Sequence, residues 1–377
     1  MARKLKSDKL LFTATLLLVG TSVVMVYSSS AVLALEKNND PYLYLIKQAV
    51  WALLGFLLVP IVMRVDYRNY RQPAFIWTGL GFVGLALVAV LFGQPINGAS
   101  RWLGIGPLGI QPSELAKVVV IVFIAALLER RMDHMAESPR ALLPIGVVLA
   151  VVVGLILAEP DLGTAVSVLM IAAVMLFAAG INYRYVLTLI LTLAPVFYVL
   201  IETSAYRKRR VMSFLNPWAD PLGDGYQMVQ SMIAVGTGGV FGRGLMGGVQ
   251  KLFFLPEPHN DFIYSVIAEE LGLIGATLIL ACFCVIAWRG MRTAVRAPDR
   301  FGAFLAIGLT TMVAFQALFN ISVVLGIVPP KGIPLPFVSY GGSSLLINLI
   351  GMGMLLNVSQ HASTSHVVTT TMTTSDV

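Results

Sequence analysis

Ten apolar stretches, each about 20 residues long, constrain the fold of this chain more than any other feature of its sequence. The 377 residues are 57% hydrophobic and only 12% charged, and the charges gather in short clusters between the stretches. We therefore predict an all-α integral membrane protein. Its ten transmembrane helices are expected near residues 10–35, 44–63, 74–92, 113–128, 142–158, 162–180, 185–201, 262–288, 302–326 and 340–358.

The basic residues predict which side of the membrane each loop faces. Alternate short loops are rich in arginine, which marks the cytoplasmic side, and both termini are then cytoplasmic. The net charge of +7 reflects this topology, because no basic stripe with interleaved aromatic residues indicates nucleic-acid binding. The arginines of the inner loops are Arg64, Arg68, Arg71, Arg130, Arg131, Arg140, Arg184, Arg289, Arg292, Arg296 and Arg300.

One connection breaks the pattern of short loops. Residues 202–260 form a long, Gly-rich outer loop between the seventh and eighth expected helices, and long loops of this kind are usually functional. We treat residues 1–360 as a single membrane domain that includes this loop. Residues 361–377 are rich in Ser and Thr and are predicted to form a disordered cytoplasmic tail.

Charged side chains at membrane depth are costly, so each one is a functional candidate. Glu114 and Lys117 lie three residues apart in the sequence QPSELAK, a spacing at which they can pair on one helix face. The pair either serves a substrate or only makes both charges tolerable.

A second candidate cluster precedes the eighth expected helix. Glu257, His259 and Asp261 place three proton-binding or metal-binding groups within five residues. Asp261 falls at the start of the helix, where an aspartate is often only an N-cap. A lone histidine in a polar loop is more often structural than functional, and both alternatives stay open.

Arginines in the outer loops form a third group. Arg101, next to Trp102, is either a lipid-headgroup anchor or a phosphate clamp. The same two interpretations apply to the basic run at 207–210, from which Arg207 and Arg210 are candidates for a polyphosphate contact. Ser339 and Ser343 belong to a small-residue entry to the last helix, which by itself indicates close helix packing or a kinked turn.

These pieces, in this order, resemble the family of shape, elongation, division and sporulation proteins that includes FtsW, RodA and SpoVE. The resemblance covers about residues 10–358. Within the family, the run MVYSSS at 25–30 and the step from Pro330 to Gly332 look more like the FtsW type than the RodA type. The matching stretches are NGASRW at 97–102, QPSELAK at 111–117, EPDLGTA at 159–165, NPWADPLGDGYQMVQS at 216–231, FLPEPHNDFIYSVIAEELG at 254–272 and KGIPLPFVSYGGSS at 331–344.

The resemblance implies ten helices around an outward-facing cavity and an activity that polymerises peptidoglycan strands from lipid II. It assigns the essential carboxylate to Asp261 and implies that Arg101, Glu114 and Lys117 are required. A sugar hydroxyl attacks a carbon that already carries a good diphosphate leaving group, so one general base is the main protic requirement. Arg101, Lys117 and a divalent cation, Mg²⁺ or Mn²⁺ with Asp261 as a candidate ligand, are expected to stabilise the departing diphosphate.

The resemblance also implies a partner and a location. The partner is a class B penicillin-binding transpeptidase, and the location is the bacterial cytoplasmic membrane with the active site on its outer face. Two other functions compete: a flippase that carries lipid II across the membrane, and a scaffold that only recruits the transpeptidase. A flippase needs access from both faces, whereas the polar features of this sequence concentrate on the expected outer side.

Overall fold

The structure is a computed structural model of the chain, and it describes residues 7–93, 101–104, 109–135, 142–181 and 205–372, with isolated positions between 184 and 203. Within these residues the regular structure is helical, apart from one antiparallel bridge between Leu103 and Ile110. The elements are α1 (Lys9–Asn38), α2 (Leu43–Arg64), the 3₁₀ helix η1 (Tyr67–Arg71), α3 (Pro73–Leu91), α4 (Pro112–Met135), α5 (Leu143–Ala158), α6 (Leu162–Ala178), α8 (Ala205–Leu215), α9 (Tyr226–Gly238), α10 (Ile263–Val295), α11 (Arg300–Val324) and α12 (Gly342–Met372).

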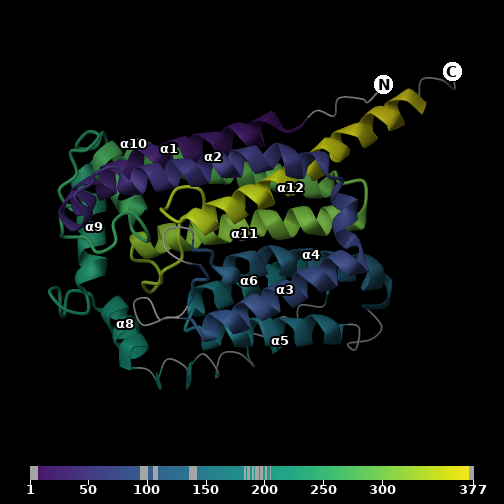
Figure 1. Cartoon of the computed structure of the whole chain (residues 1–377), viewed down its shortest axis with the longest axis horizontal. Helices are drawn as coiled ribbons and strands as arrows, with labels where there is room; N and C mark the ends of the chain where they lie inside the picture. Colours follow the sequence, from purple (N-terminus) through teal and green to yellow (C-terminus); the bar gives the residue numbers. More distant parts are fainter. Residues whose placement is uncertain are drawn as a thin grey trace.

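The long helices run side by side as a bundle (Figure 1). Helix α11 is central: it packs against α4 and α6 on one flank and against α10 and α12 on the other. Helix α12 packs along α2, and α1 packs against both α2 and α10. Figure 1 places α8 and α9 at one end of the bundle and both chain termini at the opposite end.

Aspartates stabilise the starts of three helices. The side chain of Asp8 accepts hydrogen bonds from the first backbone N–H groups of α1, Asp161 does so for α6, and Asp299 does so for α11. Elsewhere the apolar stretches form helices. Lipid offers no hydrogen-bond partners, and a helix satisfies the backbone N–H and C=O groups of a spanning segment within that segment.

The observed helices agree with nine of the ten expected spans to within a few residues at most of their ends. Six of them are long and apolar enough to cross a membrane, namely α1, α2, α3, α10, α11 and the segment Gly342–Ala362 of α12; α5 and α6 are shorter apolar helices. The expected span at 185–201 falls almost entirely on residues outside the described part. Helix α12 continues to Met372, beyond residue 358 where we placed the end of the last helix, and the side chains past Ala362 are not described.

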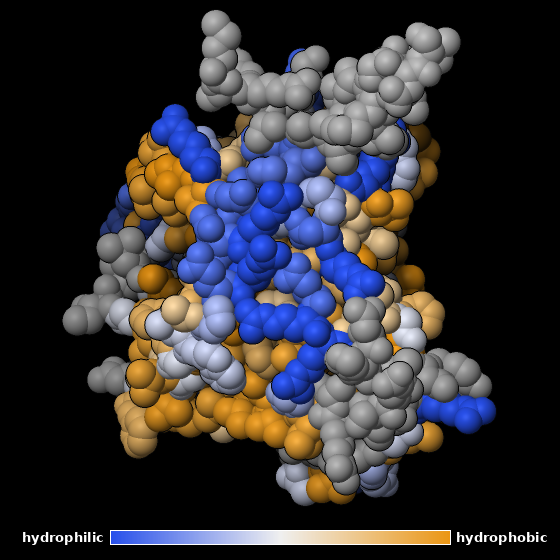
Figure 2. All heavy atoms as spheres, turned by 90° about the vertical axis from the view of Figure 1, so that its right-hand side faces the viewer, coloured by the Kyte–Doolittle hydropathy of each residue, from blue (hydrophilic) through white to orange (hydrophobic). Residues whose placement is uncertain are grey.

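The end of the bundle that carries the termini is polar. Figure 2 shows a hydrophilic patch across this end, bordered by hydrophobic surface. Ion pairs join its loops: Arg68 lies 3.0 Å from Asp299, and Arg71 lies 2.9 Å from Glu129. Arginines of the segment 64–71 therefore lie on one face with the loop before α11 and with the residues of α4 near Glu129.

Candidate functional site

Asp261 lies in the loop that leads into α10. Helix α10 begins at the end of the bundle that carries α9, opposite the chain termini (Figure 1). The buried amide of Asn320, on α11, fixes this loop by donating to the backbone oxygens of Asp261 (2.9 Å) and Ile333 (2.8 Å). The hydroxyl of Ser339 donates to the backbone oxygen of Asn260 at 2.6 Å. Two segments far apart in the sequence, 257–262 and 331–341, are thus joined around one carboxylate.

Gly332 leaves the space that the Asp261 carboxylate needs. A β-carbon placed on Gly332 would lie 2.9 Å from Oδ2 of Asp261, closer than real side chains approach. Glycine is therefore required at position 332 for Asp261 to keep its observed position.

The environment of Asp261 suits a proton acceptor. Partial burial raises its pKa to about 6, helped by the negative charges of Glu257 and Asp161, while Arg210 and Arg101 act in the opposite direction. A carboxylate with this pKa is ionised at neutral pH and is still basic enough to accept a proton from a reacting hydroxyl. Asp261 is not the cap of α10, because Phe262 holds the cap position and no side chain donates or accepts a capping hydrogen bond there.

Arg101 lies against the turn between α5 and α6. Its guanidinium donates to the backbone oxygens of Pro160 (2.7 Å) and Glu159 (3.4 Å). In the same turn, Asp161 accepts from Thr164 and from the side chain of Gln111 (3.1 Å). The neighbouring Trp102 is 40% exposed. The structure therefore fixes Arg101 by its backbone contacts on the same face as Asp261, whose charge it influences.

Glu159 is a carboxyl that the sequence analysis did not single out. Its side chain is 1% exposed, and neither carboxyl oxygen has a hydrogen-bond partner among the described residues. Burial and the nearby Asp161 raise its pKa to about 8, against the opposing charge of Arg101. It is therefore largely protonated at neutral pH. Its only sequence signal was its place beside Asp161 in the stretch EPDLGTA.

Glu114 and Lys117 form a closed pair in the interior of the bundle. Their side chains are almost fully buried, and Nζ of Lys117 lies 2.7 Å from Oε1 of Glu114. Ser344, on α12, donates to the other carboxyl oxygen at 3.0 Å. The hydroxyl of Ser343 accepts from the backbone N–H of Gln111 at 3.4 Å. The pair and its contact with Ser344 therefore join α4 to α12, and the described residues around Lys117 bury its side chain.

His259 and Glu257 have contrasting environments. The His259 ring is 3% exposed and packs against Tyr44 and Tyr340, with ring centroids 4.8 and 5.5 Å away. Burial lowers its pKa, so the ring is neutral. The Glu257 side chain is exposed and accepts from the side-chain amide of Asn260 at 2.8 Å. The His259 ring thus makes aromatic packing contacts, whereas Glu257 faces solvent.

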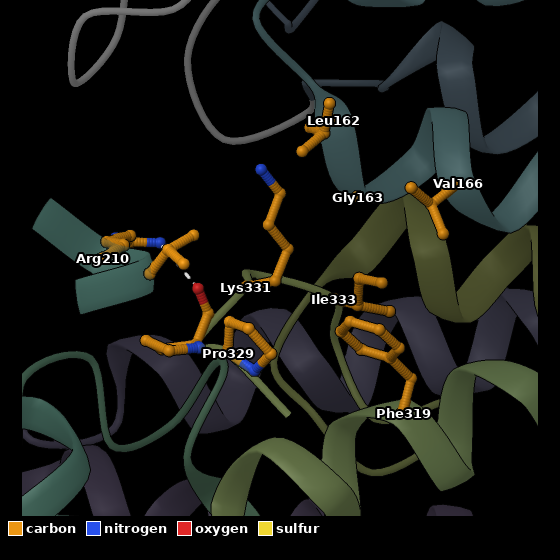
Figure 3. Close-up of a pocket in the computed structure, with 10 residues that line it drawn as sticks. Leu162, Gly163, Val166, Arg210, Phe319, Pro329, Lys331 and Ile333 are labelled. Atoms are coloured by element: carbon orange, nitrogen blue, oxygen red, sulfur yellow. Dashed lines mark hydrogen bonds between the residues drawn. The ribbon is translucent and has the colours of Figure 1, made fainter. Parts of the chain in front are cut away.

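A pocket of about 190 Å³ opens beside this site (Figure 3). Its walls are apolar side chains of α6, α8, α11 and the segment 329–333, and two cationic residues, Arg210 and Lys331, lie among them. Arg210 donates to the backbone oxygen of Pro330 at 3.4 Å. Figure 3 shows the Lys331 amine extending into the space between α8 and the start of α6. The side chain of Arg207 lies outside the described part.

The two other described cations of α8 contact carboxylates instead. Lys208 pairs with Glu202 at 2.7 Å, and Arg209 lies 3.8 Å from Asp224. Of the basic run described in the structure, Arg210 is the member that reaches the pocket.

The carboxylates near Asp261 do not form a metal cage of their own. Across the described ranges, no group of three or more His, Cys, Asp or Glu side chains is arranged to hold a metal ion. Asp161 already accepts three hydrogen bonds, and Glu257 is engaged by Asn260. The donor set fits only an ion that arrives with a phosphate ligand, because Mg²⁺ is commonly held by one or two carboxylates plus substrate phosphates.

The fold and the site define a class of protein. It is a helical, multi-pass membrane protein that holds a partly buried carboxylate, Asp261, near cationic side chains at one end of the helix bundle. Comparison with known proteins makes the assignment specific. Residues 8–364 match the family described as "Cell cycle protein", whose members are FtsW, RodA and SpoVE. The chain belongs to this family.

Individual relatives agree with the family match. The chain is 45% identical to a "Probable peptidoglycan glycosyltransferase FtsW" of Geobacter sulfurreducens over 89% of its own length and 91% of that protein. It is 42% identical to "Stage V sporulation protein E" of Bacillus subtilis, with 96% and 99% covered.

Solved structures share the fold. One chain belongs to a structure described as "Structural coordination of polymerization and crosslinking by a peptidoglycan synthase complex"; its TM-score is 0.78 at 32% identity, with 95% of this chain and 99% of that chain covered. The rod shape determining protein RodA of Thermus thermophilus matches with a TM-score of 0.70 at 28% identity, with 94% and 97% covered.

Proposed function

We propose that this protein is a peptidoglycan glycosyltransferase that joins lipid II units by β-1,4 linkages and releases undecaprenyl diphosphate. The observation that carries the proposal is Asp261, held by Asn320 and Gly332 beside the charges of Arg210 and Arg101. Relatives at 42–45% identity support it, since those named FtsW are described as probable peptidoglycan glycosyltransferases.

The reaction needs one proton acceptor. The 4-hydroxyl of the acceptor sugar gives its proton to the Asp261 carboxylate while its oxygen forms a bond to the anomeric carbon of the donor. The bond from that carbon to the diphosphate breaks, and the diphosphate leaves with the electron pair. Because the donor linkage is α and the product is β, a single displacement with inversion accounts for the outcome.

Fixed positive charge stabilises the departing diphosphate. Arg101 and Arg210 both lower the pKa of Asp261 by their charges, which supports assigning them this role. Glu114 and Lys117, as a closed buried pair, support the site by tying α4 to α12. A Mg²⁺ or Mn²⁺ ion carried by the diphosphate would add charge neutralisation.

The membrane setting follows from the same arrangement. We propose ten spans in the bacterial cytoplasmic membrane, with the polar end of Figure 2 in the cytoplasm and Asp261 on the outer face. The partner is a class B penicillin-binding transpeptidase, a proposal supported by the likeness to a chain of a peptidoglycan synthase complex. The similarity to proteins named FtsW favours a role in division over one in elongation.

The test uses purified full-length protein with its transpeptidase partner, lipid II and Mn²⁺. Glycan strands resolved by gel electrophoresis are the expected product. In parallel, vesicles that contain the protein and fluorescent lipid II report transbilayer movement. Movement without polymer would replace the glycosyltransferase with a flippase, and neither result from a folded complex would favour a scaffold.

A further inference from the structure

The pocket beside Asp261 combines two chemistries that few ligands share. Its walls are apolar, with Val166 of α6, Phe319 of α11 and Ile333 among them. Arg210 and Lys331 bring two positive charges to the same space. A ligand that satisfies both must carry an apolar chain joined directly to an anionic head.

The size of the pocket indicates that it holds only part of such a ligand. Pockets that enclose a whole small ligand usually measure about 300–1,000 Å³, whereas this one measures about 190 Å³. It has room for a short length of chain, and the rest of the ligand must extend outside.

The pocket and the catalytic carboxylate are adjacent along one strip of backbone. Lys331 and Ile333 line the pocket, while Gly332, between them, faces the Asp261 carboxylate. The Asn320 amide holds the backbone oxygens of both Ile333 and Asp261, so the two sites keep a fixed separation. A sugar attached to an anionic head at the pocket rim would therefore lie toward Asp261.

We propose that this pocket binds the first isoprene units of the donor's prenyl chain, and that Lys331 and Arg210 bind the diphosphate joined to it. This inference rests on the proposed function, in which a prenyl diphosphate is the leaving group. Inversion requires the attacking hydroxyl and the leaving group to lie on opposite sides of the anomeric carbon. Asp261 lies on one side of residues 331–333, where the hydroxyl attacks, and the pocket lies on the other side, where the diphosphate leaves. Lys331 thus becomes a substrate-binding residue.

A photolabel tests the site directly. The probe is farnesyl diphosphate with a diazirine on its first isoprene unit, added to the full-length protein in nanodiscs. We expect the label on peptides that contain Val166 or Phe319, and we expect Val166→Trp, which fills the pocket, to abolish it. Val147→Trp is the matched control, because Val147 is 54% exposed on the neighbouring helix α5.

Competitors distinguish a prenyl diphosphate from an ordinary lipid. Lipid II and undecaprenyl diphosphate should suppress labelling, and phosphatidylglycerol should not. Equal suppression by phosphatidylglycerol, or a label found away from the pocket, would overturn the inference.

Steady-state kinetics test the role of the charge. Lys331→Met should lower kcat/KM for lipid II by about 10- to 100-fold, the usual effect of losing a hydrogen bond to a charged group. The loss should include kcat, because charge builds on the diphosphate as it leaves, and Lys331→Arg should restore part of it. Lys208→Met is the control, since Lys208 pairs with Glu202.

The two proposals fail in different ways. If wild-type protein makes glycan strands but Lys331→Met and Val166→Trp behave like their controls, the pocket assignment is wrong and the proposed function stands. If wild-type protein makes no glycan while the probe still labels the pocket with the expected competition, the prenyl diphosphate site stands and the proposed function fails.

Discussion

At the scale of single residues, Asp261 predicts the pH dependence of the enzyme. The pKa of Asp261 is raised to about 6, so the carboxylate becomes protonated as the pH falls through 6 and can no longer accept a proton. The activity of the enzyme should therefore be full above pH 6 and fall below it. We expect kcat/KM to show an acidic limb with its midpoint near 6. Removing the opposing charge with Arg210→Met should move that midpoint to higher pH. A flat profile between pH 5 and 7 would contradict this assignment of the base.

Gly332 gives a second prediction at this scale. Gly332→Ala should lower polymerisation by at least about tenfold, because the new methyl group displaces the Asp261 carboxylate from its observed position. The protein should still fold, since a side-chain end moves and no backbone does. Gly341→Ala is the control: its added carbon would meet only an ordinary contact at 3.7 Å from Ser344. Similar activities for the two variants would show that the carboxylate is not held this closely.

At the scale of the helix, α10 is interrupted two residues after a pair of buried glutamates. Gly272 has φ 66° and ψ −165°, which only glycine adopts readily. The loop that follows α9 packs into this break. The backbone N–H groups of Arg243 and Gly244 donate to the backbone oxygens of Glu269 and Glu270, each at 3.0 Å. The outer loop is thereby attached to the helix that begins beside Asp261.

Buried side chains strengthen this attachment. Nζ of Lys251 lies 2.6 Å from Oε1 of Glu270 and donates to Ser28 of α1, whose hydroxyl in turn contacts the same carboxylate at 2.7 Å. We expect Lys251→Met to destabilise the protein by about 3–5 kcal/mol, since it leaves a buried charge unpaired. The double variant Lys251→Met/Glu270→Gln should recover part of the loss. Thermal melting in detergent measures both, and a double variant less stable than either single one would refute the pairing argument.

At the scale of the whole molecule, the distribution of charge predicts the topology. The background for the test is the variant Cys282→Ala/Cys284→Ala. In intact cells, a cysteine placed at Trp218, which is 60% exposed near α8, should react with a membrane-impermeant maleimide. A cysteine at Arg296, in the loop before α11, should react only after permeabilisation. The reverse pattern would invert the membrane orientation and move Asp261 to the cytoplasm.

Most of the bundle could be predicted from the sequence, because apolar length determines where a membrane helix begins and ends. Helices α8 and α9 were not predicted: both lie in the outer loop, where amphipathic segments give no continuous apolar run. Asp261 could be proposed as a site residue from the resemblance to the family and from its position at the start of the eighth expected helix. The contacts of Asn320 and Gly332 with Asp261 could not be predicted, and neither could the burial of Glu159 without a partner among the described residues, because each depends on how distant segments pack.

The central claim is that Asp261 is the base of a glycan polymerase. The most direct test compares glycan-strand synthesis from lipid II by wild-type protein, Asp261→Asn and the control Asp224→Asn, each purified with the transpeptidase partner. Asp224 lies in the same outer loop and is half-exposed. We predict polymer from the wild type and the control and none from Asp261→Asn, with equal melting temperatures. Polymer from Asp261→Asn at the wild-type rate would contradict the account.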